Sequence, residues 1–176
     1  MRALVVYESM YGNTRHIAEA IAEGLGGEGV AELVPVAEAA DLDAVDCDLL
    51  VVGGPTHVHG MSRESTRHEA EEAAMVAADD LPLEPNATLT GVRDWLESLP
   101  ERTGRAVAFD TRVDAMPLLT GRASKGITKL LRRAGYEIVA DPESFLVDKE
   151  THLIPGEQDR ARRWGETLSQ LSSSRV

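Results

Sequence analysis

The residues best suited to binding chemistry lie in a short loop that reads Ser9-Met10-Tyr11-Gly12-Asn13-Thr14. The loop follows an apolar run at 3–7 and opens into a helical pattern. The first turn of a helix presents free backbone N–H groups and the positive end of the helix dipole, which together bind anions. The hydroxyls of Ser9 and Thr14 can add donors, and Gly12 lets the backbone come close to a ligand. The sequence therefore predicts a phosphate-binding loop.

A second polar loop spans 53–61 and follows the apolar run at 49–52. Its two glycines and proline, at 53–55, predict that the chain turns sharply away from the strand. The hydroxyl of Thr56 and the rings of His57 and His59 could line a flat ligand, and Gly60 permits an unusual peptide conformation. A His-x-His pair could also hold a metal ion, but no carboxylate or cysteine cluster accompanies it. We therefore favour walls for a flat ligand, or ordinary loop polarity, over a metal site.

A third loop, 110–119, follows another apolar run and begins with Asp110, Thr111, Arg112 and Val113. Asp110 could face a ligand or could simply form a turn. The segment after it leads into a helical pattern, for which Ser124 is the expected N-cap because its hydroxyl can accept a bond from the first turn.

Short apolar segments alternate with amphipathic helical patterns along the chain. The predicted strands are 2–7, 32–35, 48–53, 105–110 and 136–140, the last with a continuation at 144–147. Helical patterns cover 13–25, 125–134 and about 157–171. This alternation predicts a doubly wound, parallel α/β sheet, in which ligands bind outside the carboxyl ends of the strands. The three loops should therefore converge at one edge of the sheet.

We expect one domain over 1–176, with a long excursion after the third strand at 62–90 and a frayed tail at 172–176. Within the excursion, 62–75 favours a helix, the prolines at 82 and 85 interrupt it, and a further helix begins near 90. The single cysteine, Cys47, is interpreted as a small core residue. No signal peptide and no apolar stretch of membrane length are evident, so a soluble, cytoplasmic protein is expected.

The chain has 18 Lys and Arg residues against 30 Asp and Glu, which gives a formal net charge of -12. Nucleic acids and anionic membranes would be repelled by such a protein, so neither is an expected partner. The same charge suits a partner protein with a basic docking surface.

Three segments carry a resemblance to a known family: VVYESMYGNTRHIAEAIAEGL, VVGGPTHVHGM and AVAFDTRV. Together they resemble the flavodoxin family, and more closely those members in which a PTH loop precedes an SR…STR helix. The resemblance covers about 1–61 and 91–171. It implies a five-stranded parallel sheet of order 2-1-3-4-5, helices on both faces, and FMN at the switch point.

Carried over by position, the resemblance assigns the FMN phosphate to the first loop and the isoalloxazine ring to the other two. The implied FMN-binding residues are Ser9, Met10, Tyr11, Gly12, Asn13, Thr14, Pro55, Thr56, His57, Val58, His59, Gly60, Asp110, Thr111, Arg112 and Val113.

Two positions depart from the family pattern. Tyr11 stands where the family has a small hydroxyl residue, a loss that backbone donors, or Arg15 folded back, could offset. The third loop lacks the usual aromatic residue beside the ring, so His57, His59 or Tyr11 would have to stack. Trp95 is expected to pack with its apolar neighbours, although the excursion could bring it over the ring.

The resemblance implies an electron-transfer protein that uses FMN and needs no general acid, base or nucleophile, since the flavin carries the chemistry. We expect a monomer or weak dimer. One alternative is an FMN-dependent NAD(P)H:quinone oxidoreductase on the same fold, with Arg63, Arg67 and Arg112 meeting an anionic substrate. Others are a flavodoxin-like shell with weak or no FMN binding, and a receiver-type module, which would need more acidic residues than Glu8 after the first strand.

Overall fold

A parallel β-sheet forms the centre of the protein. The computed structural model describes residues 1–41, 47–57, 60–77, 82–116 and 120–173. The strand order is β2-β1-β3-β5-β6, and each neighbouring pair on this path is parallel. The bounds are β1 (Ala3–Tyr7), β2 (Ala31–Pro35), β3 (Leu49–His57), β5 (Gly104–Val113) and β6 (Tyr136–Ile138). This arrangement confirms the predicted doubly wound order.

Two further strands were not predicted as separate elements. β7 (Glu143–Val147) pairs in parallel with the second half of β5, beyond the end of β6. The fifth strand is thus divided in two, and Pro142, which has no N–H to donate to a ladder, lies at the division. β4 (Gly60–Met61) runs antiparallel to the end of β3.

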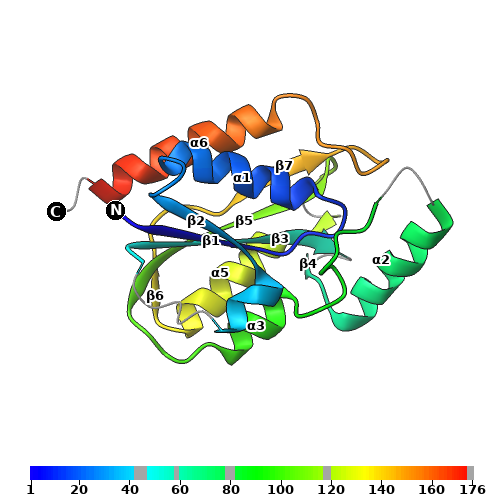
Figure 1. Ribbon diagram of the computed structural model, residues 1–176, viewed down its shortest axis with the longest axis horizontal. Helices are drawn as coiled ribbons and strands as arrows, with labels where there is room; N and C mark the ends of the chain where they lie inside the picture. The colour runs from blue at the N-terminus through cyan, green and yellow to red at the C-terminus, as the bar shows by residue number, and fades with distance from the viewer. Residues whose placement is uncertain (42–46, 58–59, 78–81, 117–119, 174–176) are drawn as a thin grey trace.

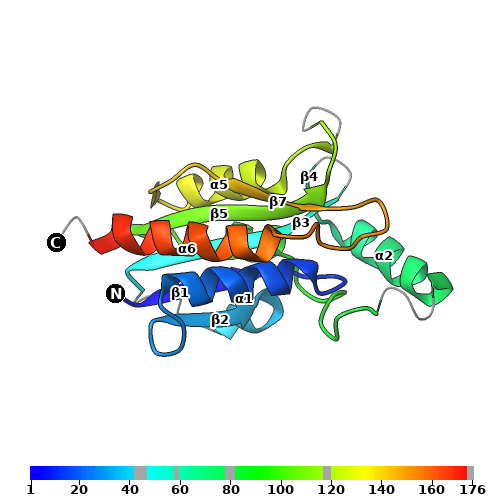
Figure 2. The same cartoon turned by 90° about the horizontal axis from the view of Figure 1, so that it is seen from above.

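Helices cover both faces of the sheet, as expected (Figure 1; Figure 2). One face carries α1 (Asn13–Leu25) and α6 (Glu157–Ser173), and the other carries α3 (Val92–Ser98) and α5 (Ala123–Arg133). Each face has its own apolar core, because side chains of successive strand residues point to opposite sides. Trp95 is buried in the α3–α5 core with Leu96, so it does not lie over the predicted ligand site.

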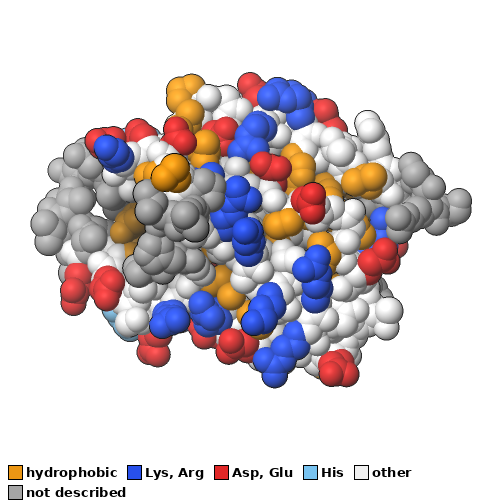
Figure 3. Space-filling model, turned by 180° about the vertical axis from the view of Figure 1, so that it is seen from behind, with side chains coloured by type: hydrophobic (Ala, Val, Ile, Leu, Met, Phe, Trp, Pro, Cys, Tyr) orange, Lys and Arg blue, Asp and Glu red, His pale blue; other side chains and the backbone are white. Residues whose placement is uncertain are grey.

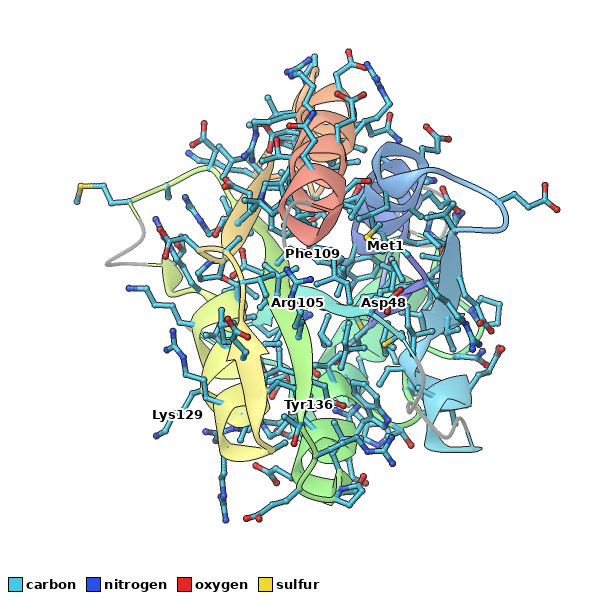
Figure 4. All side chains as sticks on the ribbon, turned by 90° about the vertical axis from the view of Figure 1, so that its left-hand side faces the viewer. Met1, Asp48, Arg105, Phe109, Lys129 and Tyr136 are labelled. Carbon is cyan, nitrogen blue, oxygen red and sulfur yellow. The ribbon has the colours of Figure 1, made fainter. Side chains whose placement is uncertain are left out.

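All strands on the main path begin at the same end of the molecule. Figure 4 looks onto this end and shows Met1, Asp48, Arg105 and Tyr136 where the strands start. The carboxyl ends of β1, β3 and β5 therefore share the opposite edge, where the predicted loops begin. Close pairing maintains this alignment, since Tyr7 lies beside Gly53 and Gly53 beside Phe109.

The prediction that the chain turns away at 53–55 was wrong. β3 continues to His57, because Gly54 and Pro55 pair with Asp110 and Thr111 of the lengthened β5. Gly53 is required by packing rather than by a turn, since a Cβ atom there would overlap the Phe109 ring.

The excursion after β3 contains α2 (Glu64–Ala77) and a segment that returns to α3. Figure 1 shows α2 projecting beyond the carboxyl edge of the sheet.

A short 3₁₀ helix, η1 (Val36–Asp41), follows β2. In the predicted tail, 172–173 belong to α6, and 174–176 lie outside the described residues. No helix in the described part of the chain has the length and apolar character needed to cross a membrane.

The crossing of α1 and α6 depends on two glycines. A Cβ atom on Gly165 would overlap the carbonyl oxygen of Ile21 and would lie 3.0 Å from the Cα atom of Gly24. A Cβ atom on Gly24 would likewise overlap the carbonyl oxygen of Arg162. Backbone atoms cannot move aside as side chains do, so these helices touch only because both positions lack a side chain.

We predict that Gly165→Ala lowers the free energy of unfolding by about 1–3 kcal/mol, because overpacking pushes α6 away from α1. The substitution itself favours a helix by about 1 kcal/mol, so any loss comes from packing. Urea denaturation measures the change. The matched control is Gly126→Ala in α5, where the new Cβ would meet only the flexible end of Met61, at 2.9 Å. Equal stability of the two variants would contradict the prediction.

Candidate functional site

The three predicted loops meet in one cleft at the carboxyl edge of the sheet. The cleft has a volume of about 210 Å³. Its lining includes ten of the predicted site residues, together with Val147 and Thr151, which were not predicted. Both could have been found by the rule that ligands bind outside the carboxyl ends of parallel strands, since Val147 ends β7 and Thr151 follows it. The predicted residues that line the cleft are Met10, Tyr11, Asn13, Thr14, Pro55, Thr56, His57, Thr111, Arg112 and Val113.

The first loop has the geometry of an anion site. Gly12 adopts a left-handed conformation (φ 86°) at the N-cap of α1, and its carbonyl oxygen accepts the N–H of His16 at 2.9 Å. Ser9 Oγ accepts the N–H of Gly12 at 3.2 Å, which closes the turn. The backbone N–H groups of Asn13, Thr14 and Arg15 have no hydrogen-bond partner among the described residues. These free donors and the helix dipole point to an anionic ligand.

Polar contacts tie this loop to the others. The hydroxyls of Thr14 and Thr111 lie 2.8 Å apart, and both side chains are buried. The Asn13 amide donates to the carbonyl oxygen of Thr151 at 2.6 Å. The loop after β1 is therefore connected directly to β5 and to the segment after β7, and the cleft between them has fixed walls.

Tyr11 binds the excursion through a hydrogen bond from its hydroxyl. The Tyr11 hydroxyl donates to the carbonyl oxygen of Ala70 in α2 at 3.0 Å. The ring packs beside a small apolar cluster of Met10, Ala70 and Ala87. The hydroxyl that the family pattern would place at a phosphate is thus replaced by a ring that anchors α2.

Arg15 is also engaged with the excursion. Its Nε donates to Glu84 at 3.0 Å, and a second guanidinium nitrogen lies 2.8 Å from Glu19. The backbone N–H of Glu84 donates to the carbonyl oxygen of Met10 at 2.7 Å. The excursion therefore contacts the loop after β1 through the segment around Glu84 as well as through α2.

The second loop forms a hairpin with β4. Thr56 pairs with Met61 and His57 with Gly60, while Val58 and His59 lie outside the described residues. The Thr56 hydroxyl accepts the N–H of Ala123, which fixes the start of α5. His57 Nε2 is buried without a hydrogen-bond partner among the described residues. Burial lowers the pKa of His57, so its ring is a neutral, flat wall of the cleft.

The third loop divides its polar residues between the cleft and the core. Arg112 lines the cleft, donates to the carbonyl oxygens of Val113 and Ala115 at 3.1 and 2.8 Å, and has a buried Nε with no partner among the described residues. Asp110 is fully buried and lies away from the cleft lining, and burial raises its pKa.

Asp110 caps α5 from the strand. Its carboxylate accepts the backbone N–H of Ser124 at 2.7 Å. The prediction that Ser124 is the N-cap was wrong, since Arg122 holds that position and Ser124 is buried within the first turn. The Asp110 carboxylate, from β5, thus satisfies one of the free N–H groups in the first turn of α5.

A buried polar network at the end of β1 was not predicted. The Glu8 carboxylate accepts hydrogen bonds from the Ser62 hydroxyl and from the N–H of Val92, the latter at 2.8 Å. Arg67, only 4% exposed, donates to Ser62 at 3.3 Å and to Asp94 at 2.9 Å. Burial raises the pKa of Glu8, and these hydrogen bonds oppose the shift. Arg67 is thus committed to joining α2, α3 and β1, and is not available to a substrate.

Other predicted positions lie at the margin of the site. Ser9 and Gly12 shape the first loop but do not line the cleft, and Gly60 lines a neighbouring cavity. Within the described part of the chain, no three His, Cys, Asp or Glu side chains gather as metal ligands.

The strand order β2-β1-β3-β5-β6, with helices on both faces of the sheet, is that of a flavodoxin-like fold. Residues 4–77 match the model of the flavodoxin domain. No curated protein sequence matches the chain. The fold is similar to an archaeal flavodoxin, with 21% identity, a TM-score of 0.61 and coverage of 98% of this chain and 99% of that one.

Two further solved structures share the fold. Oxidised flavodoxin 1 from Bacillus cereus is 15% identical, with a TM-score of 0.58 and coverage of 100% and 99%. Rubredoxin oxygen:oxidoreductase from Desulfovibrio gigas is 15% identical, with a TM-score of 0.60, and the match covers 98% of this chain and 36% of that one. The expected resemblance to the flavodoxin family is confirmed by the family model over 4–77, and the solved structures show the same fold over the whole chain.

We predict that His57 makes the stability of the protein depend on pH. Because its native pKa lies below that of the unfolded chain, near 6.5, the unfolded state takes up a proton first as the pH falls. The part of the unfolding free energy that depends on His57 is therefore fully present above about pH 6.5 and is lost as the pH falls below it. Urea denaturation between pH 7.5 and 5 should show a smaller loss for His57→Gln than for the unmodified protein.

The control for this measurement is His68→Gln, because His68 is exposed on α2. Its unfolding free energy should follow that of the unmodified protein across the same pH range. A His57→Gln variant that loses stability with the same slope would contradict the assignment.

Proposed function

We propose that this protein binds FMN in the cleft and exchanges electrons with a redox partner protein. The observation that carries the proposal is the set of free N–H groups of Asn13, Thr14 and Arg15, at the entrance to a cleft made by the three loops. The flavodoxin-domain match and the flavodoxin-like fold support the same conclusion. When bound, the flavin supplies the redox chemistry, and the protein supplies binding, orientation and electrostatics.

The residues of the cleft fit FMN. The free N–H groups and the Thr14 hydroxyl would hold the phosphate. The neutral ring of His57 and the ring of Tyr11 give the cleft flat surfaces, and the unpartnered Nε of Arg112 gives it a donor for a ligand oxygen. The contact between Thr14 and Thr111 keeps the phosphate loop and the third loop in fixed positions without the ligand. Preorganisation of this kind reduces the entropic cost of binding.

The purified protein should retain one FMN per chain after mixing with FMN and removal of the excess, as its visible absorption will show. Riboflavin, which lacks the phosphate, is the matched control ligand. We expect it to bind at least tenfold more weakly, because the free N–H groups bind an anion. Equal affinity for the two flavins would contradict the phosphate-binding loop, and a colourless protein would contradict the proposed function.

We predict that Thr14→Val weakens FMN binding at least tenfold, because it removes a buried hydroxyl at the loop without a large change in volume. Tyr11→Phe should change the affinity less than threefold, because the Tyr11 hydroxyl bonds to Ala70 rather than to the ligand. Its effect should appear in the stability, as a loss of about 1 kcal/mol. Fluorescence titration with FMN measures both affinities, and the reverse order would show that Tyr11 has been misassigned.

A second function is favoured by a neighbouring cavity. A space of about 610 Å³ shares His57 with the cleft and lies against the start of α2. Arg63 and Arg93 line it, so it suits the anionic substrate of an FMN-dependent NAD(P)H:quinone oxidoreductase. Steady-state oxidation of NAD(P)H by a quinone separates this enzyme from an electron carrier. The other lining residues are Gly60, Met61, Ser65, Thr66 and Glu69.

A further inference from the structure

The positive charge of this chain is concentrated in one region. The stretch 102–135 contains eight Lys and Arg residues but only two Asp, whereas the whole chain contains 18 Lys and Arg against 30 Asp and Glu. One of those two acids, Asp110, is fully buried. The surface formed by this stretch is therefore cationic on a protein whose net charge is strongly negative.

α5 presents these charges as a stripe. Lys125, Lys129 and Arg132 are exposed and lie at positions i, i+4 and i+7, which share one side of a helix. Figure 4 shows Lys129 pointing away from the body of the protein. From the side that carries α5, the space-filling view shows a band of Lys and Arg side chains (Figure 3).

The cations of this stripe are not neutralised within the described part of the chain. Ion pairs there involve Arg2, Arg15, Arg67, Arg160 and Arg162, but none of the α5 cations. α5 itself contains no acidic residue. Unpaired charges of one sign produce a local potential that attracts the opposite sign from solution.

The stripe continues to the mouth of the cleft. α5 begins beside it, since the N–H of Ala123 donates to the Thr56 hydroxyl at 2.9 Å. Arg122 stands at the N-cap of α5, and Arg112 lines the cleft. Neither arginine makes an ion pair with a described residue. A macromolecule that covered these cations would also come to lie against the cleft. We define the basic face as Arg112, Arg122, Lys125, Lys129 and Arg132.

We propose that the basic face is the docking surface for an electron-transfer protein whose own docking surface is acidic. The proposal rests on the proposed function, which gives the adjoining cleft an electron to exchange. Net charge alone predicts the opposite, a partner with a basic surface. Salt at physiological strength screens charges beyond about 8 Å, however, so the charges at the contact determine association more than the total does. The electron that the adjoining cleft would exchange selects a redox protein over a nucleic acid as the occupant.

The experiment measures the binding of two probes to the chain with and without FMN, at low and high salt. A plant-type [2Fe–2S] ferredoxin is the acidic probe, and cytochrome c is the basic one. Ferredoxin should bind at low salt and lose affinity as salt is added. Lys125→Glu/Lys129→Glu should weaken ferredoxin binding at least tenfold and should not weaken that of cytochrome c.

The matched control is Arg2→Glu/Arg162→Glu, which changes the net charge equally at two exposed positions away from the basic face. It should change ferredoxin affinity less than threefold. Equal weakening by both variants would overturn the proposal, since only net charge would then matter. Tighter binding of oligouridylate than of ferredoxin, or self-association that Lys125→Glu/Lys129→Glu abolishes, would also overturn it.

Failure of the proposed function gives a different result. A chain that takes up no FMN but binds ferredoxin through α5 would keep the docking surface and contradict the cofactor. A chain that takes up FMN and binds ferredoxin without salt dependence would support the cofactor and contradict the docking surface.

Discussion

The parallel register of β1, β3 and β5 is the constraint on which the site depends. Tyr7, Gly53 and Phe109 lie side by side across three strands, so the loops that follow them start at one level of the sheet. This alignment requires Gly53, because any side chain there would overlap the Phe109 ring. The cleft, the free N–H groups of α1 and the start of α5 are all positioned relative to this row.

The excursion is bonded to the loop that follows β1. Glu8, the residue before the loop, is bound by Ser62 and by the N–H of Val92, so both ends of the excursion meet the end of β1. Tyr11 holds α2 from the loop itself. At the position that departs from the expected family pattern, Tyr11 therefore supports α2, while the N–H groups at the start of α1 have no partner among the described residues.

The distribution of charge carries different information from its total. The chain is strongly acidic as a whole, yet α5 has four Lys and Arg residues and no acid. Counting residues along the sequence shows that the chain as a whole is acidic and that α5 is basic. Only the fold shows that the cations of α5 share one exposed side and that this side reaches the cleft, because helix periodicity and the contact between Ala123 and Thr56 bring them there.

The sequence by itself determined the α/β class and the three segments that meet at one edge of the sheet, because buried parallel strands and amphipathic helices leave strong local patterns. The strand order was implied only by the resemblance to the flavodoxin family. It also predicted an anion site after β1, since that prediction needs only a strand, a short loop and a helix. Tertiary structure decided what local patterns cannot encode. Pairing with β5 extended β3 past its glycines, a carboxylate from β5 capped α5, and the excursion engaged Tyr11 and Arg67. Each depends on a partner distant in the chain, whose position is known only when the sheet has formed.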